Sequence, residues 1–145
     1  MFRRTKRQSS LQPEREGAHA SLMQILMAAL LLLFVIALLR IRKFAAVYDF
    51  VKQWPTRCRF ALAREPREAD LVQAVHHASV LIPIRTLCLV YSAALAVLLR
   101  SYGIRADLVI GVTHRPFAGH TWVEVEGRII GESKYTDTCV VLDRF

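Results

Sequence analysis

The sequence predicts an α+β domain in which helices come first and an antiparallel sheet follows them. Apolar residues recur at helical spacing as far as Arg100. After Gly103 the pattern changes to β-branched runs and to alternation, which is typical of strands. A run of helices followed by a run of strands is characteristic of the α+β class. The chain has 145 residues, which suits one domain and hardly two.

The composition is that of a folded and basic protein. Hydrophobic residues make up 54% of the chain, with only 6 Gly and 5 Pro, so the composition is not that of a disordered chain. The net charge is +8, from 20 Lys and Arg against 12 Asp and Glu, and favours an anionic membrane face or an acidic peptide as partner. The arginines are scattered, lack interleaved aromatics and carry no nucleic-acid-binding signature, so nucleic acid is not predicted.

Three cysteines occur, at Cys58, Cys88 and Cys139. Their odd number, their wide spacing and the lack of a C-x-x-C pair argue against a disulfide framework or a zinc ribbon. A reduced, cytoplasmic setting fits best. Two of the three are expected to be small buried apolar residues.

The first 43 residues are expected to stand apart from the domain proper. Residues 1–20 read as a basic, mobile tail, and Ser21 to Leu39 form an apolar run at the threshold length for a membrane span. Arg40, Arg42 and Lys43 follow it directly, where a cleaved signal peptide would have small residues. Two alternatives stay open: a membrane-spanning helix, or a helix (residues 21–43) packed on the domain or lying on a membrane surface.

Three helices are expected before Gly103. The first continues at helical spacing and ends at Pro55. The second opens near Pro66 and stops at Pro83. The third runs from Thr86 to Arg100, with Gly103 as its stop. Apolar residues of the first helix continue at roughly helical spacing through Phe44, Val47, Tyr48, Phe50 and Val51. In the second helix, one stripe comprises Leu71, Val72, Val75 and Ala78, and in the third a core-facing stripe comprises Leu87, Tyr91, Ala94, Leu95 and Leu98.

Three strands are expected over Ala106–Val112, His120–Val125 and Arg128–Glu132. Because glutamate is a poor residue for positive φ, Glu126-Gly127 should belong to a three-residue hairpin loop, Val125 to Gly127. That register pairs Glu124 with Arg128, Trp122 with Ile130, and His120 with Glu132. The alternative register pairs Thr121 with Glu132 and turns Glu132 to the other face.

The chemistry-bearing residues are Cys88, His120 and Glu132. Cys88 opens a helix, where unpaired N–H groups and the helix dipole favour the thiolate, which is the nucleophile. His120 opens a strand, and a carboxylate beside it would fix its tautomer and orientation. This order along the chain is the papain and transglutaminase arrangement. Structural alternatives remain for each residue: a small buried thiol, a structural histidine and a solvent-exposed carboxylate.

A set of short motifs resembles the leader peptidases that process lasso-peptide precursors. The resemblance covers about Phe44 to Phe145, and its most specific segments are Cys-Leu-x-x-Ser and Phe-x-x-His-x-Trp-Val-Glu. The motifs are Val75-His76-His77-Ala78, Leu81-Ile82-Pro83, Arg85-Thr86-Leu87-Cys88-Leu89, Ser92-Ala93, Leu98-Leu99-Arg100, Gly103, Gly111-Val112, Phe117, His120, Trp122-Val123-Glu124, Gly127, Glu132 and Val140-Val141-Leu142.

The resemblance implies a transglutaminase-like cysteine peptidase domain over residues 44–145. Its substrate would be a ribosomally made precursor peptide, from which it removes the leader without metal or cofactor. The family's nucleophile, base and orienting acid carry over to Cys88, His120 and Glu132. The chain has no room before Phe44 for the family's winged-helix leader-binding domain. A separate leader-binding protein and a separate lasso cyclase are therefore the implied partners.

The sequence departs from the family pattern at three positions. Tyr91 stands where a basic residue is expected, Gly119 where relatives often have alanine, and Glu132 where aspartate is commoner. Asp137 and Asp143 are alternative acids, both outside the hairpin register.

Other site assignments and rival functions stay open. Tyr91 and Trp122 are candidate substrate contacts, although Trp122 would equally suit the core. The backbone N–H of Cys88 is expected to be one oxyanion donor, with Gln73 as a weak candidate for the second. The rival functions are acyl transfer by the same triad and a non-catalytic, membrane-associated adaptor. A metal site of His114, His120 and Cys88 matches no common zinc spacing.

Overall fold

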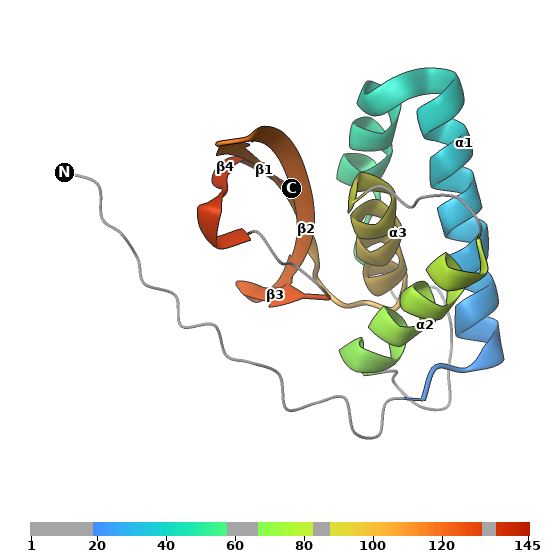
Figure 1. The fold of residues 1–145 in the computed structure, drawn as a ribbon. Coiled ribbons are helices and arrows are strands. Elements are labelled where there is room, and N and C mark those ends of the chain that lie inside the picture. Colours follow the sequence, from blue (N-terminus) through green and yellow to red (C-terminus); the bar gives the residue numbers. More distant parts are fainter. Residues whose placement is uncertain (1–18, 58–66, 83–87, 132–135) are drawn as a thin grey trace.

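The computed structural model describes residues 19–57, 67–82, 88–131 and 136–145, and its architecture is α+β, as predicted (Figure 1). The basic tail over residues 1–18, Cys58, Pro66 and Glu132 lie outside these ranges. The sheet is antiparallel, with strand order β3-β2-β1-β4. Its elements are α1 Leu22–Gln53, α2 Glu68–Leu81, α3 Cys88–Ser101, β1 Asp107–His114, β2 Phe117–Val125, β3 Arg128–Ile130, a short 3-10 helix Thr136–Thr138 and β4 Val140–Arg144.

Helix α1 starts at a capping box and folds back on itself. Ser21 accepts a hydrogen bond from the Gln24 backbone N–H, and the Gln24 side chain accepts one from Ser21. At Lys43 the backbone leaves the helical region, with φ 65° and ψ −171°. Figure 1 shows the two halves of α1 running in opposite directions, and the rings of Phe34 and Phe50 lie 5.1 Å apart between them. The sequence predicted the end near Pro55 but gave no sign of this bend.

One face of α1 packs into the same core as α2 and α3. The residues Gln24, Ala28, Leu32 and Val35 are buried, at the spacing of a helical stripe. The apolar run is therefore a helix packed on the domain, which was one of the two open alternatives. Its outer face remains exposed and apolar. By length and composition, α1 is also long enough and apolar enough to cross a membrane.

Helix α3 lies at the centre of the domain, between the other helices and the sheet. Every residue from Ser92 to Ser101 is buried. The predicted stop is confirmed, because Gly103 has φ 83° and its N–H bonds the carbonyl of Arg100. The predicted stripe on α2 is confirmed in essence: Leu71, Val75 and Ala78 are fully buried and Val72 is partly buried, with Ala74 added.

Arg100 holds three parts of the chain together from within the core. It is 5% exposed, and its guanidinium donates to the carbonyls of Ala106 at 2.8 Å, Val51 at 2.5 Å and Phe145 at 2.8 Å. The guanidinium of Arg100 on α3 therefore links the end of α1 to the C-terminal residue Phe145. Burial lowers the pKa of Arg100 from its ordinary value, and nearby Asp107 opposes that shift.

Strand β4 was not predicted. It pairs with β1, Val112 facing Val140 and Gly111 facing Val141, and a backbone pair joins Leu108 to Phe145. The three apolar residues that open β4 do not alternate with polar ones, so period-2 patterning gave no signal. The strand also sits at the sheet edge, where pairing on one side suffices.

The predicted register of the β2–β3 hairpin is wrong. The turn has two residues, Glu126 and Gly127, with φ 51° and 77°, and the pairs are Val123–Ile130, Glu124–Ile129 and Val125–Arg128. A two-residue turn of this kind matches the twist of the strands. The register also places Ile130 beside buried Val123 on the helix-facing side, and burying an aliphatic side chain there, worth about 2 kcal/mol, offsets the strain of roughly 1 kcal/mol at Glu126.

Candidate active site

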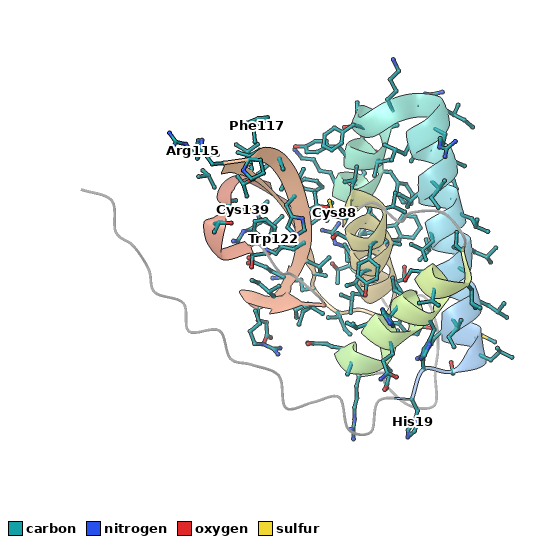
Figure 2. The ribbon with its side chains drawn as sticks, viewed as in Figure 1. His19, Cys88, Arg115, Phe117, Trp122 and Cys139 are labelled. Atoms are coloured by element: carbon teal, nitrogen blue, oxygen red, sulfur yellow. The ribbon has the colours of Figure 1, made fainter. Side chains whose placement is uncertain are left out.

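Cys88 is the first residue of α3, as predicted, and it is half-buried. Its position gives it the unpaired N–H groups and the positive dipole end of the first helical turn. Figure 2 shows it on the side of β2 that faces the helices. The helix behind it is buried from Ser92 to Ser101, so the cysteine is held by a helix and not by a loop.

His120 lies on β2, opposite Gly111 of β1, and is half-buried with a buried Nε2 atom. Side chains alternate along a strand, so His120 shares its face with Trp122 and Glu124. Val123 and Val125 take the other face, where they join the core formed with the helices. A histidine on this outer face can meet a thiol on α3 only across the edge of β2.

A hydrogen bond shows that α3 begins beside that edge. The Ser92 hydroxyl, one turn after Cys88, donates to the carbonyl of Thr121, the neighbour of His120, at 3.0 Å. Strand carbonyls point along the plane of the sheet, so a side chain that bonds one approaches from the edge. Four residues of an α-helix rise about 6 Å, so Cys88 lies close to this contact. The structure therefore brings together the segments that carry Cys88 and His120.

The ring of His120 stacks on the indole of Trp122, with centroids 6.1 Å apart and an interplanar angle of 28°. Trp122 is 4% exposed, which fits the alternative of a core role for its indole. Its Nε1 donates to Oε1 of Glu124 at 2.9 Å, and Arg144 lies 3.0 Å from Oε2 of the same carboxylate. Glu124 is also buried, and the arginine from β4 supplies its counter-charge.

The residues proposed for the third position fall in different parts of the chain. Glu132 and the side chain of Asp137 lie outside the described residues. The observed hairpin register differs from the one that would pair Glu132 with His120, so strand pairing does not support Glu132 as the orienting acid. Asp143 lies on β4, and β1 separates it from β2.

Asp143 has a different partner. Its Oδ2 accepts the hydroxyl of Tyr48 at 2.6 Å, and Lys52 donates to that hydroxyl at 3.0 Å. The hydrogen bond from Tyr48 lowers the pKa of Asp143, with a further contribution from the backbone N–H of Arg144. This carboxylate fastens β4 to α1 and does not serve His120.

The remaining candidates are dispersed. Tyr91 is half-buried beside Gly131, at the described end of β3. Gln73 is half-buried on α2, and His114 ends β1 in an exposed position. Within the described ranges, His114, His120 and Cys88 do not form a metal-binding cluster.

Cys139 lies on the same face of the sheet as His120. A Cβ at position 111 would be 3.1 Å from the Cβ of Cys139, and Gly111 is the cross-strand partner of His120. Figure 2 shows Cys139 and Trp122 together on the side of β2 away from Cys88. Burial raises the pKa of the Cys139 thiol, which disfavours its thiolate. Of the two described cysteines, Cys88 therefore has the better environment for a nucleophile.

We expect Cys139 to resist alkylation at neutral pH. A raised pKa means that the thiolate forms only above the ordinary cysteine value, so labelling should begin at a more alkaline pH in the folded protein than in urea. Iodoacetamide labelling from pH 6 to pH 10, read by peptide mass spectrometry, measures this. Equal pH midpoints in the folded and unfolded protein would contradict the expectation.

Several site residues had no role assigned from the sequence. Ser92 bonds the neighbour of His120, Gly111 lies opposite His120, and Arg144 pairs with Glu124, but the sequence pattern suggested no role in the site for any of these four residues. The alternation Trp122-x-Glu124 could have been read as two side chains on the face of His120. Ser92 lies one turn after Cys88 and could have been placed on the same side of the helix. Arg144 depends on β4, which the sequence did not reveal.

Comparison with known proteins gives two matches. The family model described as the transglutaminase-like superfamily matches residues 28–142. The "Microcin J25-processing protein McjB" of Escherichia coli is 52% identical over 46 residues, a stretch that covers 32% of this chain and 22% of that protein. The chain thus matches about a fifth of the length of this relative. No solved structure matches the chain.

Proposed function

Because the chain belongs to the transglutaminase-like superfamily, we propose that it is a cysteine peptidase that removes the leader from a lasso-peptide precursor. The observation that carries the proposal is the Ser92–Thr121 hydrogen bond, which sets the start of α3 beside the His120 segment of β2. The short match to a microcin-processing protein supports a role in peptide maturation. The environment of Cys139 supports Cys88 as the nucleophile.

The reaction would use two displacements. The Cys88 thiolate attacks the carbonyl carbon at the leader–core junction, and the backbone N–H of Cys88 stabilises the oxyanion. The peptide C–N bond breaks, a thioester forms with the leader, and the His120 imidazolium protonates the departing amine. The neutral imidazole then takes a proton from water, which hydrolyses the thioester and regenerates the thiolate. Glu132 remains our candidate for orienting His120, with Tyr91 as a candidate substrate contact.

The test is cleavage of a precursor peptide by the purified chain. We expect two fragments cut at the leader–core junction, with a faster reaction when a separate leader-binding protein presents the leader. The released core N-terminus would then be free for a lasso cyclase to join to a side-chain carboxyl group. No cleavage in the presence of that partner would refute the proposal.

The same chemistry could transfer the acyl group to an amine instead of water. Adding methylamine at high concentration separates the two outcomes, because transfer gives a leader amide that mass spectrometry distinguishes from the free acid. A free-acid product at all amine concentrations supports the peptidase. An unreactive Cys88 with no product of either kind would favour the non-catalytic adaptor.

We infer that the chain attaches to the cytoplasmic face of an anionic membrane with α1 lying in the membrane plane. The outer face of α1 is exposed and apolar, and the bend presents basic side chains beside it. Ala28, Leu32 and Val35 on the inner face are fully buried, so a spanning helix would have to leave the core. In-plane binding uses only the face that the domain leaves exposed. The outer face comprises Leu22, Met23, Leu26, Leu30, Leu33 and Phe34, and the basic tip comprises Arg40, Arg42 and Lys43.

We expect the purified protein to sediment with vesicles that contain phosphatidylglycerol and to bind pure phosphatidylcholine vesicles more weakly. The double variant Leu26→Glu/Leu30→Glu should lose most of this binding, because both leucines are more than half exposed on the outer face. Val80→Glu/Leu81→Glu, on exposed apolar residues of α2, is the matched control and should bind normally. Release by 1 M salt supports in-plane attachment, since salt screens the basic tip. Resistance to salt and to alkaline carbonate would show a spanning helix instead.

A further inference from the structure

Four side chains of the outer sheet face form a continuous series from β4 to His120. Arg144 lies 3.0 Å from Oε2 of Glu124, and Oε1 of Glu124 accepts the indole N–H of Trp122 at 2.9 Å. The indole in turn stacks on the ring of His120. The contacts follow from the sequence, because positions 120, 122 and 124 of one strand share a face.

The middle of this series is held tightly. Trp122 and Glu124 are each 4% exposed. The side chain of Arg144 is 42% exposed and therefore also reaches solvent. The indole packs directly on the backbone of Gly111, because a Cβ there would lie 2.9 Å from two carbons of the indole. Any larger residue at position 111 would push the indole off the sheet. The indole is therefore fixed by close packing at one end and by a charged acceptor at its N–H.

From these contacts we propose that Trp122, oriented by Glu124, positions the imidazole of His120 for its reaction with Cys88. Trp122 and Glu124 would be positioning residues, and Arg144 would hold the Glu124 side chain through their 3.0 Å contact. The proposal rests on the proposed function only in assigning His120 as the base. A base displaced by about 1 Å can lose on the order of 100-fold in rate, so fixing its stacking partner matters.

The alternative is that the series serves stability alone. A buried indole with a satisfied N–H is common in protein cores. A purely structural role predicts lower stability in a variant, with unchanged kinetics for the fraction that remains folded. A positioning role predicts a change in kcat and in the titration of His120 for fully folded protein.

The variants Trp122→Phe and Glu124→Leu test the proposal. Phenylalanine keeps an aromatic ring but lacks the N–H donor, and leucine removes the acceptor and the charge. We expect kcat for precursor cleavage to fall about 10- to 100-fold in both, with KM changed less than twofold. We also expect the acid limb of the kcat/KM–pH profile to shift. Glu124→Gln, which keeps an oxygen acceptor for the indole, should restore most of kcat.

Glu126→Gln is the matched control, because Glu126 is exposed in the turn after the same strand and its carboxylate lies 4.0 Å from Arg128. Circular dichroism and thermal unfolding establish which variants are folded at the assay temperature. Unchanged kcat and an unchanged pH profile in folded Trp122→Phe and Glu124→Leu would overturn the proposal.

A second measurement keeps the proposal separate from the proposed function. The ring protons of His120, assigned by comparison with His120→Gln, can be titrated by NMR in the absence of any substrate. We expect Trp122→Phe and Glu124→Leu to move both the chemical shifts and the titration midpoint of His120, and Glu126→Gln to move neither. The proposed positioning role is refuted if the titration midpoint of His120 is the same in Trp122→Phe and Glu124→Leu as in wild-type protein. If wild-type protein cleaves no precursor but the midpoint moves, the peptidase assignment fails and the positioning contact stands.

Discussion

Replacing Cys88 by alanine is expected to abolish leader cleavage, with a fall in kcat of at least about 1000-fold. The thioester cannot form without the thiolate, and no neighbouring described group can replace it from the start of α3. The fold should persist, because Cys88 is only half-buried at the end of an element whose core residues begin at Val90. Mass spectrometry of the precursor after incubation with Cys88→Ala and with wild-type protein measures the effect.

The matched control is Cys139→Ala. Cys139 is also half-buried, just before β4, but burial raises the pKa of its thiol. We expect this variant to retain cleavage within a fewfold of wild type. Normal cleavage by Cys88→Ala would exclude Cys88 as the nucleophile, and loss of cleavage only in Cys139→Ala would assign that role to the other cysteine.

Selective labelling adds a test that needs no precursor. An alkylating agent at neutral pH should modify Cys88 faster than Cys58 and Cys139 if the helix start and His120 favour the thiolate. His120→Ala should remove that selectivity. Equal labelling of all three thiols in wild-type protein would show that Cys88 is not activated in the isolated chain.

Replacing Arg100 by methionine is expected to lower the free energy of unfolding by about 3 kcal/mol. Methionine fills similar volume but leaves the buried carbonyls of Val51, Ala106 and Phe145 without their guanidinium donors. Relief of the desolvated charge offsets part of the loss. For a domain of this size the melting temperature should fall by roughly 10 °C, which thermal unfolding followed by circular dichroism measures.

Arg105→Met controls for the loss of a positive charge, because Arg105 is exposed five residues later in the chain. Its melting temperature should stay within about 2 °C of wild type, as expected for a surface substitution. Arg100→Lys should fall between the two, since an ammonium cannot reach all of the carbonyls that a guanidinium fork reaches. A melting temperature of Arg100→Met equal to that of wild type would show that the carbonyls find other donors.

Local pattern predicted most of the helical half of the fold. The apolar stripe at Leu71, Val75 and Ala78 and the stop at Gly103 depend on nearby residues, and both are confirmed. The bend at Lys43 depends on α1 packing back on itself, and lysine carries no local signal for positive φ. The hidden role of Arg100 likewise depends on three carbonyls that are distant in sequence.

The sheet shows where local turn rules fail. The low tolerance of Glu126 for positive φ favoured a three-residue loop, but pairing Ile130 with Val123 in the core outweighed that strain. Strand β4 forms because β1 offers an edge, a fact about tertiary structure that no pattern in residues 140–144 expresses.

The candidate site could be predicted in part. The sequence placed Cys88 at a helix start, which is confirmed. It placed His120 at the start of a strand, whereas β2 begins three residues earlier, at Phe117. The adjacency of the two segments required the Ser92–Thr121 bond, which joins residues 29 positions apart. The Arg144–Glu124 contact required β4. Glu132 stays a prediction, because it lies outside the described residues.

The bend in α1 places a lysine, Lys43, where the backbone conformation favours glycine. Glycine adopts the conformation of Lys43 without strain, whereas a lysine there costs roughly 1–3 kcal/mol. A glycine at position 43 would recover that free energy but remove a positive charge from the tip of the bend. If the domain binds membranes as proposed, thermal stability and binding to anionic lipid change in opposite directions at this residue. On that proposal, selection for thermal stability alone would favour a glycine at position 43 and weaker binding to anionic lipid.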